Sequence, residues 1–257
     1  MYMFYVINTN YSYLTFRVLY FSIHRFEHGT FWPNLKESDF NAIGHGSGMG
    51  YNFNLPLNKT GMGNGDYLAI FQQILIPVAI EFQPELIIIS AGYDAALGCP
   101  EGEMEVTPAF YPHLINPLIK LANSRLAVVL EGGYCLDSLA EGAALTLRAL
   151  LGEPCPMLVE KLQPPCLSIK ESILNCIYTH RPYWKCLQVQ ETYTMEDLNN
   201  VNPQPNLHKI NRLFIGGPPP PDRYPTRGTG PKLPLEVIAC NSLRLKRLKD
   251  GKFLCNK

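Results

Sequence analysis

Two short loops carry side chains that could do chemistry, and each loop follows an apolar run. Residues 86–90 (LIIIS) are followed by Ala-Gly-Tyr and then Asp94, and residues 126–130 (LAVVL) are followed by Glu-Gly-Gly and then Tyr134. A carboxylate can bind a metal ion or transfer a proton. A protonated phenol can donate a hydrogen bond to a developing oxyanion. Together these groups indicate carbonyl or amide chemistry at a metal.

The elements that must position these groups alternate along the chain. The apolar run at 18–24 and the two runs above are typical of buried strands, and residues 51–56 alternate with the period of two of a short strand. Apolar residues at helical spacing predict a helix over 66–82, with a kink at Pro77. Two further helices are predicted over 107–123, with Thr107 as N-cap, and over 136–151. This alternation predicts an α/β fold in which helices cover both faces of a parallel sheet.

Parallel strands end at one edge of a sheet, and ligands bind beyond that edge. We therefore expect Asp94 and Tyr134 to share a pocket, where Gly132 and Gly133 let a substrate approach the backbone. A structural alternative stays open: Asp94 caps the next turn, and Gly-Gly-Tyr is only a tight strand-to-helix loop. A phosphate-binding loop is a weak match, because the glycine spacing is that of neither nucleotide-binding motif.

Composition narrows the class of protein. The 257 residues include 22 basic and 22 acidic side chains, so bulk electrostatic binding to nucleic acid is not expected. No run approaches the roughly 20 apolar residues of a membrane span, and we expect no membrane contact. The eight cysteines form no CxxC pair. They are interpreted as reduced thiols of a cytoplasmic protein, with the nucleus as the alternative.

Three regions are predicted. Residues 1–17 form an atypical, aromatic-rich N-terminal segment that lacks the pattern of a signal peptide and is interpreted as a non-native start. Residues 18–190 form the globular part. Residues 191–257 form a proline-rich linker or tail, in which Pro218–Pro221 is a candidate polyproline II ligand for a partner domain.

Four strings carry a resemblance to a known family: SIHRFEHGTFWP, GMGNGDYLAIF, PELIIISAGYDAALGCPEGEMEVTPAFYPHL and VVLEGGYCLDSLAEGA. The chain resembles the zinc-dependent histone deacetylases over about residues 18–190. Within that family it is most similar to class IIb, and there to the C-terminal half of the first catalytic domain of the two-domain tubulin and histone deacetylases, insect-type. The resemblance implies an arginase/deacetylase-like, three-layer α/β/α fold that is incomplete at its N-terminal side.

The resemblance also implies roles for individual residues. Asp94 would be a zinc ligand, and Tyr134 would polarise the acetyl carbonyl during hydrolysis of N-acetyl-lysine. Trp32, Gly132 and Gly133 would line the substrate tunnel. The hydroxyl of Ser22 and the carbonyl of Ile23 resemble, more weakly, part of a site for a monovalent cation such as K+.

The implied substrates are acetylated proteins such as histones and tubulin. Glu101 stands at the family position that gates the tunnel mouth, where a carboxylate favours a cationic substrate. An acetylpolyamine deacetylase is therefore an alternative function. Otherwise Glu101 is an ordinary solvated residue.

The sequence departs from the family pattern in its metal ligands. It has no tandem His-His pair and no DxDxHH string, so it offers one zinc ligand where a catalytic site needs three. None of the six histidines is expected to replace them. We expect an exposed sheet edge beside the strand at 18–24, poor zinc binding, little deacetylase activity and a tendency to aggregate. A non-catalytic interaction fragment is the alternative.

Overall fold

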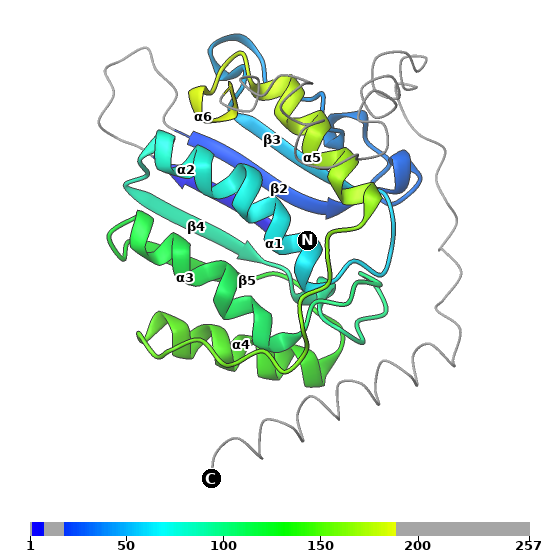
Figure 1. Ribbon diagram of the computed structural model, residues 1–257, viewed down its shortest axis with the longest axis vertical. Coiled ribbons are helices and arrows are strands. Elements are labelled where there is room, and N and C mark those ends of the chain that lie inside the picture. Colours follow the sequence, from blue (N-terminus) through cyan, green and yellow to red (C-terminus); the bar gives the residue numbers. More distant parts are fainter. Residues whose placement is uncertain (1, 8–17, 189–257) are drawn as a thin grey trace, which may run out of the picture.

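The structure is a computed structural model that describes the backbone of residues 2–7 and all of residues 18–188. The predicted boundary at 190 and the proline run Pro218–Pro221 lie outside the described residues. Five strands form one sheet: β1 (Tyr2–Ile7), β2 (Val18–Arg25), β3 (Asn52–Leu57), β4 (Leu86–Ala91) and β5 (Leu126–Leu130). Their order is β3-β2-β1-β4-β5 (Figure 1).

The sheet is parallel except for β1. Strand β2 pairs in parallel with β3, and β4 pairs in parallel with β5. Strand β1 is antiparallel to both β2 and β4. The other four strands therefore run in one direction, and their carboxyl ends meet at one edge of the sheet (Figure 1). The predicted α/β fold with parallel strands is confirmed.

The expectation of an exposed edge beside β2 is wrong. Strand β2 lies inside the sheet, between β3 and β1, because the backbone of residues 2–7 fills the position next to it. Among the strands that the structure describes, the outermost are β3 and β5. Apolar side chains are nevertheless exposed on β5, where Val129 is 48% and Leu130 is 57% accessible.

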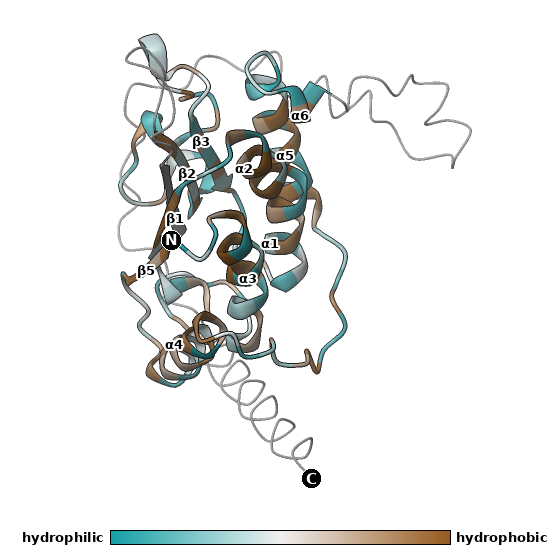
Figure 2. Cartoon of the chain, turned by 90° about the vertical axis from the view of Figure 1, so that its left-hand side faces the viewer, coloured by the Kyte–Doolittle hydropathy of each residue, from teal (hydrophilic) through white to brown (hydrophobic). Residues whose placement is uncertain are grey.

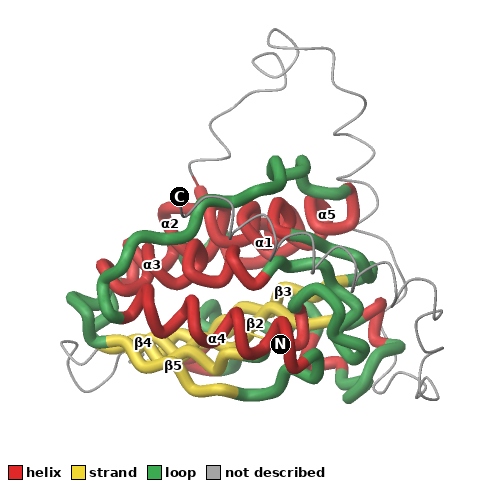
Figure 3. The backbone as a smooth tube through the Cα atoms, turned by 90° about the horizontal axis from the view of Figure 1, so that it is seen from below, coloured by secondary structure: helices red, strands yellow, loops and turns green. Residues whose placement is uncertain are grey.

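The helices gather on one side of the sheet. They are α1 (Asn64–Ile70), α2 (Ile76–Phe82), α3 (Tyr111–Leu121), α4 (Leu136–Leu150), α5 (Leu167–His180) and α6 (Lys185–Gln188). Figures 2 and 3 show α1, α2, α3 and α5 on the same face of the strands. Among the described residues the helices thus form one layer, and the helix layer expected on the opposite face is where the fold is incomplete. No element was predicted for the stretch that forms α5 and α6.

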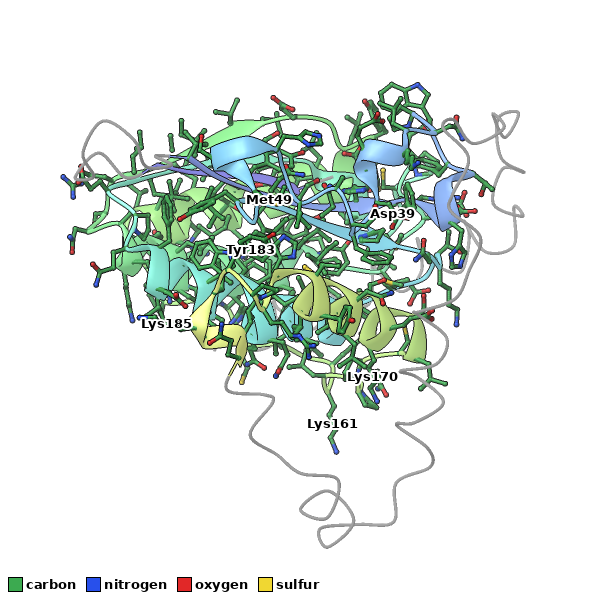
Figure 4. All side chains as sticks on the ribbon, turned by 90° about the horizontal axis from the view of Figure 1, so that it is seen from above. Asp39, Met49, Lys161, Lys170, Tyr183 and Lys185 are labelled. Carbon is green, nitrogen blue, oxygen red and sulfur yellow. The ribbon has the colours of Figure 1, made fainter. Side chains whose placement is uncertain are left out.

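Loops with short 3-10 turns cover the opposite face near β2 and β3. The amide of Asn54 on β3 donates to the carbonyls of Glu37 (3.0 Å) and Asp39 (3.2 Å) in this loop region. Figure 4 shows Asp39 and Met49 on this side of the molecule and Lys161, Lys170 and Lys185 on the helix side. The sheet is therefore covered on both faces at its β3 end but not at its β5 end.

Helices α1 and α2 form one continuous stretch, and a π-helical turn at Phe71–Leu75 joins them. Pro77 has no N–H to donate to the preceding turn, and the wider π turn accommodates this loss. The 19 residues Asn64–Phe82 are long and apolar enough to cross a membrane, which corrects the expectation that no segment approaches a span. Half of the stretch is buried inside the molecule, as in a core helix.

The start of α3 differs from the prediction in one contact. The Thr107 side chain does not cap the helix. Instead, the Asn64 amide donates to the Thr107 hydroxyl, and the Thr107 N–H donates to the Asn64 carbonyl oxygen, each at 2.9 Å. This reciprocal pair joins the first turn of α1 to the turn that precedes α3.

Helix α5 closes the core over β3. The ring of His180 stacks on Phe53 with centroids 3.8 Å apart, and its Nε2 lies 3.0 Å from the Asn52 carbonyl. The indole N–H of Trp184 donates to the Gly50 carbonyl at 2.7 Å. These contacts connect the end of the described chain to the edge strand β3 within the main apolar core.

Candidate active site

The loops after β4 and β5 are joined by hydrogen bonds at the carboxyl edge of the sheet. The Tyr93 N–H donates to the Gly132 carbonyl at 3.3 Å. The Gly133 N–H donates to Asp94 Oδ1 at 3.1 Å. The structure therefore brings Asp94 against the backbone of the loop that carries Tyr134, although the two residues are 40 positions apart in the sequence.

Two glycines make this approach possible. Gly132 has φ 85° and Gly133 has φ 118°, both in the region that favours glycine. A Cβ on Gly132 would lie 2.8 Å from Asp94 Oδ2, and one on Gly133 would lie 2.8 Å from the Cβ of Tyr93. A side chain at either position would push the two loops apart.

Tyr93 anchors the loop to the helices. Its hydroxyl donates to Thr146 on α4 at 2.9 Å, and its ring stacks on Tyr111 of α3 with centroids 4.6 Å apart. Gly142 of α4 lies against this ring, since a Cβ there would be 3.0 Å from it. Burial raises the pKa of Tyr93, so the phenol stays protonated and remains a donor. Sequence reasoning did not identify this anchor.

Tyr134 itself is on the surface. It lies between Gly133 and the start of α4, and it is 62% exposed. Its hydroxyl is therefore accessible to a molecule that approaches the carboxyl edge from solvent. The described residues place the Tyr134 backbone beside Asp94 and leave its side chain outside the core.

Arg25 holds two further loops at the same edge, and it was also missed in the sequence. Its buried guanidinium donates to the Glu101 carbonyl at 3.0 Å and pairs with Glu27 (2.5 Å) and Glu103 (3.0 Å). It also lies 4.3 Å from the ring centroid of Phe31. A buried Arg needs such partners, because an unpaired charge away from water is costly.

The contacts of Arg25 position Trp32 and Glu101. Trp32 follows Phe31 in the chain and is 74% exposed. Glu101 is exposed, and its neighbour Gly102 lies against the Asp94 carbonyl, since a Cβ on Gly102 would be 2.0 Å from that oxygen. Each of the loops that carry Trp32, Glu101, Asp94 and Tyr134 therefore contacts the next one along the carboxyl edge, the first through Arg25.

Tyr67 of α1 is buried below this edge. Burial raises its pKa, and the negative charges of Asp66 and Asp94 raise it further. Tyr67 thus lies within electrostatic range of Asp94 as a neutral, buried phenol.

His24 connects the end of β2 to the loop below the sheet. Its Nε2 lies 2.7 Å from the Ser38 carbonyl, and its Nδ1 lies 2.9 Å from the Ser22 hydroxyl. A carbonyl can only accept, so Nε2 carries the proton and Nδ1 of the neutral ring accepts from Ser22. Burial lowers the pKa of His24 to about 4. The Ser22 hydroxyl is thus engaged with His24, and a cation at Ser22 and the Ile23 carbonyl stays a prediction.

The donor set around Asp94 does not fit a catalytic zinc ion. Such an ion needs three protein ligands and an open position. Within residues 18–188, no group of three or more His, Cys, Asp or Glu side chains could hold a metal ion. His113 and His180 bond backbone carbonyls elsewhere in the fold. Asp94 as a zinc ligand stays a prediction, and the described residues do not supply a second and third ligand beside it.

The fold is that of an α/β protein whose candidate site lies at the carboxyl ends of parallel strands. Comparison with known proteins identifies the family. The family model "Histone deacetylase domain" matches residues 8–150. The chain belongs to the histone deacetylase domain family.

Several proteins share high identity with the chain. It is 48% identical over 203 residues to the human "Polyamine deacetylase HDAC10", covering 79% of this chain and 29% of the relative. It is 48% identical over 170 residues to "Histone deacetylase 6" of Caenorhabditis elegans, covering 66% of this chain and 18% of the relative. The chain thus spans less than a third of the length of these relatives.

Solved structures agree with the fold. "Structure of the histone deacetylase Clr3" superposes with a TM-score of 0.64 at 38% identity, covering 66% of this chain and 28% of that chain. "Crystal Structure of HDA15 HD domain" superposes with a TM-score of 0.61 at 34% identity, covering 68% and 46%. The arginase/deacetylase-like assignment is confirmed by these neighbours.

We predict that Gly133→Ala destabilises the chain by about 2–4 kcal/mol, because the new Cβ meets both an unfavourable φ and the Cβ of Tyr93. Gly152→Ala is the matched control, since Gly152 has φ 84° with open space around it. The control should cost only about 1 kcal/mol, for backbone strain alone. Urea unfolding of both variants measures the difference, and equal losses would contradict the close approach of the two loops.

We predict that acid destabilises the fold through His24. Its pKa is about 4 in the folded chain, below the usual 6.5, so the unfolded chain binds the proton first as the pH falls. The resulting stability is full above pH 6.5 and declines by roughly 3 kcal/mol between pH 6.5 and 4. His24→Gln should flatten this decline in urea unfolding measured across that range.

The control for this measurement is His45→Gln, the same change at an exposed histidine. His180, whose pKa is also lowered by burial, adds a decline of the same sign that both variants retain. A decline as steep in His24→Gln as in the unmodified chain would show that His24 is not its source.

Proposed function

We propose that this chain supplies part of the active site of a lysine deacetylase. The observation that carries the proposal is the hydrogen bond from the Gly133 N–H to the Asp94 carboxylate, which places a carboxylate and the Tyr134 loop at one edge. Membership of the histone deacetylase domain family supports the reaction class. The substrates would be acetylated lysine side chains, such as those of histones or tubulin, in the cytoplasm or nucleus.

In this proposal Tyr134 donates its phenol hydrogen to the carbonyl oxygen of the acetyl group. That bond strengthens as negative charge develops on the oxygen, so it lowers the barrier to attack on the amide. Asp94 would be one of three zinc ligands, and the metal would supply Lewis acidity when all three are present. Because the described residues offer one ligand, the chain alone should have little activity.

We predict that the isolated chain binds zinc no more tightly than its Asp94→Asn variant and does not turn over a fluorogenic acetyl-lysine peptide, with or without added zinc. Titration calorimetry and the peptide assay measure these two properties. Asp137→Asn, in the first turn of α4, is a carboxylate control. Robust turnover, or one-to-one zinc binding that Asp94→Asn alone removes, would contradict a partial site.

The positive test is complementation. The chain would be co-expressed with the part of the Danio rerio polyamine deacetylase domain that it does not span; that relative is 52% identical over 167 residues. Restored turnover should fall roughly 100-fold or more in Tyr134→Phe, since one oxyanion donor is lost. Undiminished turnover in Tyr134→Phe would refute the role of that hydroxyl.

We propose an acetylpolyamine as the second candidate substrate, because Glu101 presents an exposed carboxylate on the loop that touches Asp94. Arg25 fixes the Glu101 backbone through its carbonyl, so the side chain extends from a held loop. A cationic amine bound there would gain electrostatic attraction that a neutral substrate lacks. The names of the mammalian and fish relatives support this candidate.

We predict that Glu101→Gln weakens binding of acetylspermidine by about three- to tenfold, the loss of one partly exposed ion pair. Binding of the neutral ligand N-butylacetamide should not change. Both are measured by NMR titration. Glu153→Gln, which removes a carboxylate paired with Arg148 beyond the far end of α4, is the matched control. Equal weakening for both ligands, or in the control, would refute the polyamine reading.

A further inference from the structure

Two acidic residues beside Arg25 have a backbone conformation that acidic residues rarely adopt. Glu27 has φ 49° and Glu103 has φ 53°, both in the left-handed region that favours glycine. This conformation costs free energy in a residue with a Cβ, so it persists only where other contacts require it. Residues of this kind concentrate at functional sites. The contacts that hold Glu27 and Glu103 therefore indicate which loops of the carboxyl edge must stay in place.

Both carboxylates bind the same guanidinium, through different nitrogens. Glu27 Oε1 accepts from Arg25 Nε at 2.6 Å and lies 2.5 Å from Nη2. Glu103 Oε1 lies 3.0 Å from Nη1, which also donates to the Glu101 carbonyl at 3.0 Å. The carboxylate side chains are each only 15% exposed, so salt screens these pairs less than it screens surface pairs. One edge of the guanidinium thus holds the loop that leads to Trp32, and the remaining nitrogen holds the loop of Glu101.

The backbone of Glu103 is held on both sides of its left-handed φ. Its N–H donates to the Cys99 carbonyl at 3.3 Å, and its carbonyl accepts from the Gly61 N–H at 2.8 Å. Glu101 lies within this turn and is exposed. Since the ion pair with Arg25 holds the turn through the Glu103 side chain, the position of the Glu101 carboxylate depends on Glu103.

We propose that Glu103 is a positioning residue for amine recognition: its ion pair with Arg25 holds the turn of residues 99–103 so that the Glu101 carboxylate meets the cationic end of an acetylated amine. The inference rests on the proposed acetylpolyamine function and adds a residue on which the selectivity for an amine depends. Glu103 acts through Glu101 and does not contact the ligand. A neutral acetamide gains nothing from the charge of Glu101, so its binding does not depend on Glu103.

A double-mutant cycle separates this role from a direct attraction between the Glu103 charge and the amine. Binding of acetylspermidine and of N-butylacetamide to the full chain is measured by NMR titration. Glu103→Gln keeps the shape of the side chain and removes its charge. It should weaken acetylspermidine binding about three- to tenfold and leave N-butylacetamide binding unchanged. In the Glu101→Gln background it should have no further effect, because the residue that it positions is already neutral.

A glycine at this position separates recognition from stability. Glu103→Gly and Glu103→Gln both lose the ion pair, but only glycine adopts φ 53° without strain. Glu103→Gly should therefore unfold at a higher urea concentration than Glu103→Gln, and its preference for acetylspermidine should be reduced to the same extent. Recovery of stability without recovery of the preference is not expected of a residue that only supports the fold.

The matched control is Gln83→Gly. Gln83 has the same φ of 53°, at the end of α2. It precedes β4, so it lies at the edge of the sheet opposite the candidate site. This variant should raise the urea midpoint and leave the binding of both ligands unchanged.

Hydrogen exchange tests the hold on the turn without a ligand. The Gly61 N–H is bonded to the Glu103 carbonyl, so its exchange reports whether the turn stays closed. Exchange at Gly61 should become about tenfold faster in Glu103→Gln and should not change in Glu101→Gln. Unchanged exchange in Glu103→Gln would overturn the proposed hold.

The ligand measurements distinguish failure of this inference from failure of the proposed function. If Glu101→Gln reduces the preference for acetylspermidine and Glu103→Gln does not, the positioning role is wrong and the polyamine candidate stands. A loss in Glu103→Gln that persists in the Glu101→Gln background would show direct attraction instead. Equal weakening of both ligands would show a purely structural role. If the unmodified chain has no preference for acetylspermidine, both proposals are refuted.

Discussion

The hydrogen bond from the Gly133 N–H to the Asp94 carboxylate is the contact on which the candidate site depends. It forms because two glycines with positive φ remove the side chains that would otherwise separate the loops. Tyr93 then fixes the same loop to α3 and α4 through its ring and hydroxyl. A small number of local constraints thus determine where the carboxylate and the start of α4 lie.

Much of this arrangement could be predicted from the sequence. The apolar runs predicted β2, β4 and β5, because short runs without a polar side are typical of parallel strands. The burial predicted for β5 is wrong in the described residues, where Val129 and Leu130 are exposed. The convergence of the loops followed from the rule that parallel strands end at one edge. The residue strings gave the family, which the match to the histone deacetylase domain confirms.

The contacts that sequence reasoning missed join residues that are far apart in the chain. Arg25 looked like an ordinary charge at the end of a strand, and only the fold brings Glu103 and the Glu101 carbonyl to its guanidinium. Thr107 had the local pattern of a helix cap, but Asn64 binds its hydroxyl instead. The place of β1 inside the sheet could not be read from residues 2–7, since pairing with two strands is a long-range property.

Strand β1 has a consequence for the architecture as a whole. It is the spacer between two parallel half-sheets, β3-β2 and β4-β5. Neighbouring strands lie roughly 4.8 Å apart whichever way they run, so one interposed strand holds β2 and β4 about 10 Å apart. Arg25 stands on one half-sheet, and the loop of Glu101 and Glu103 that it binds follows β4 on the other. The distance that Arg25 bridges is therefore set by the one strand between β2 and β4. It would be the same if that strand ran in the opposite direction.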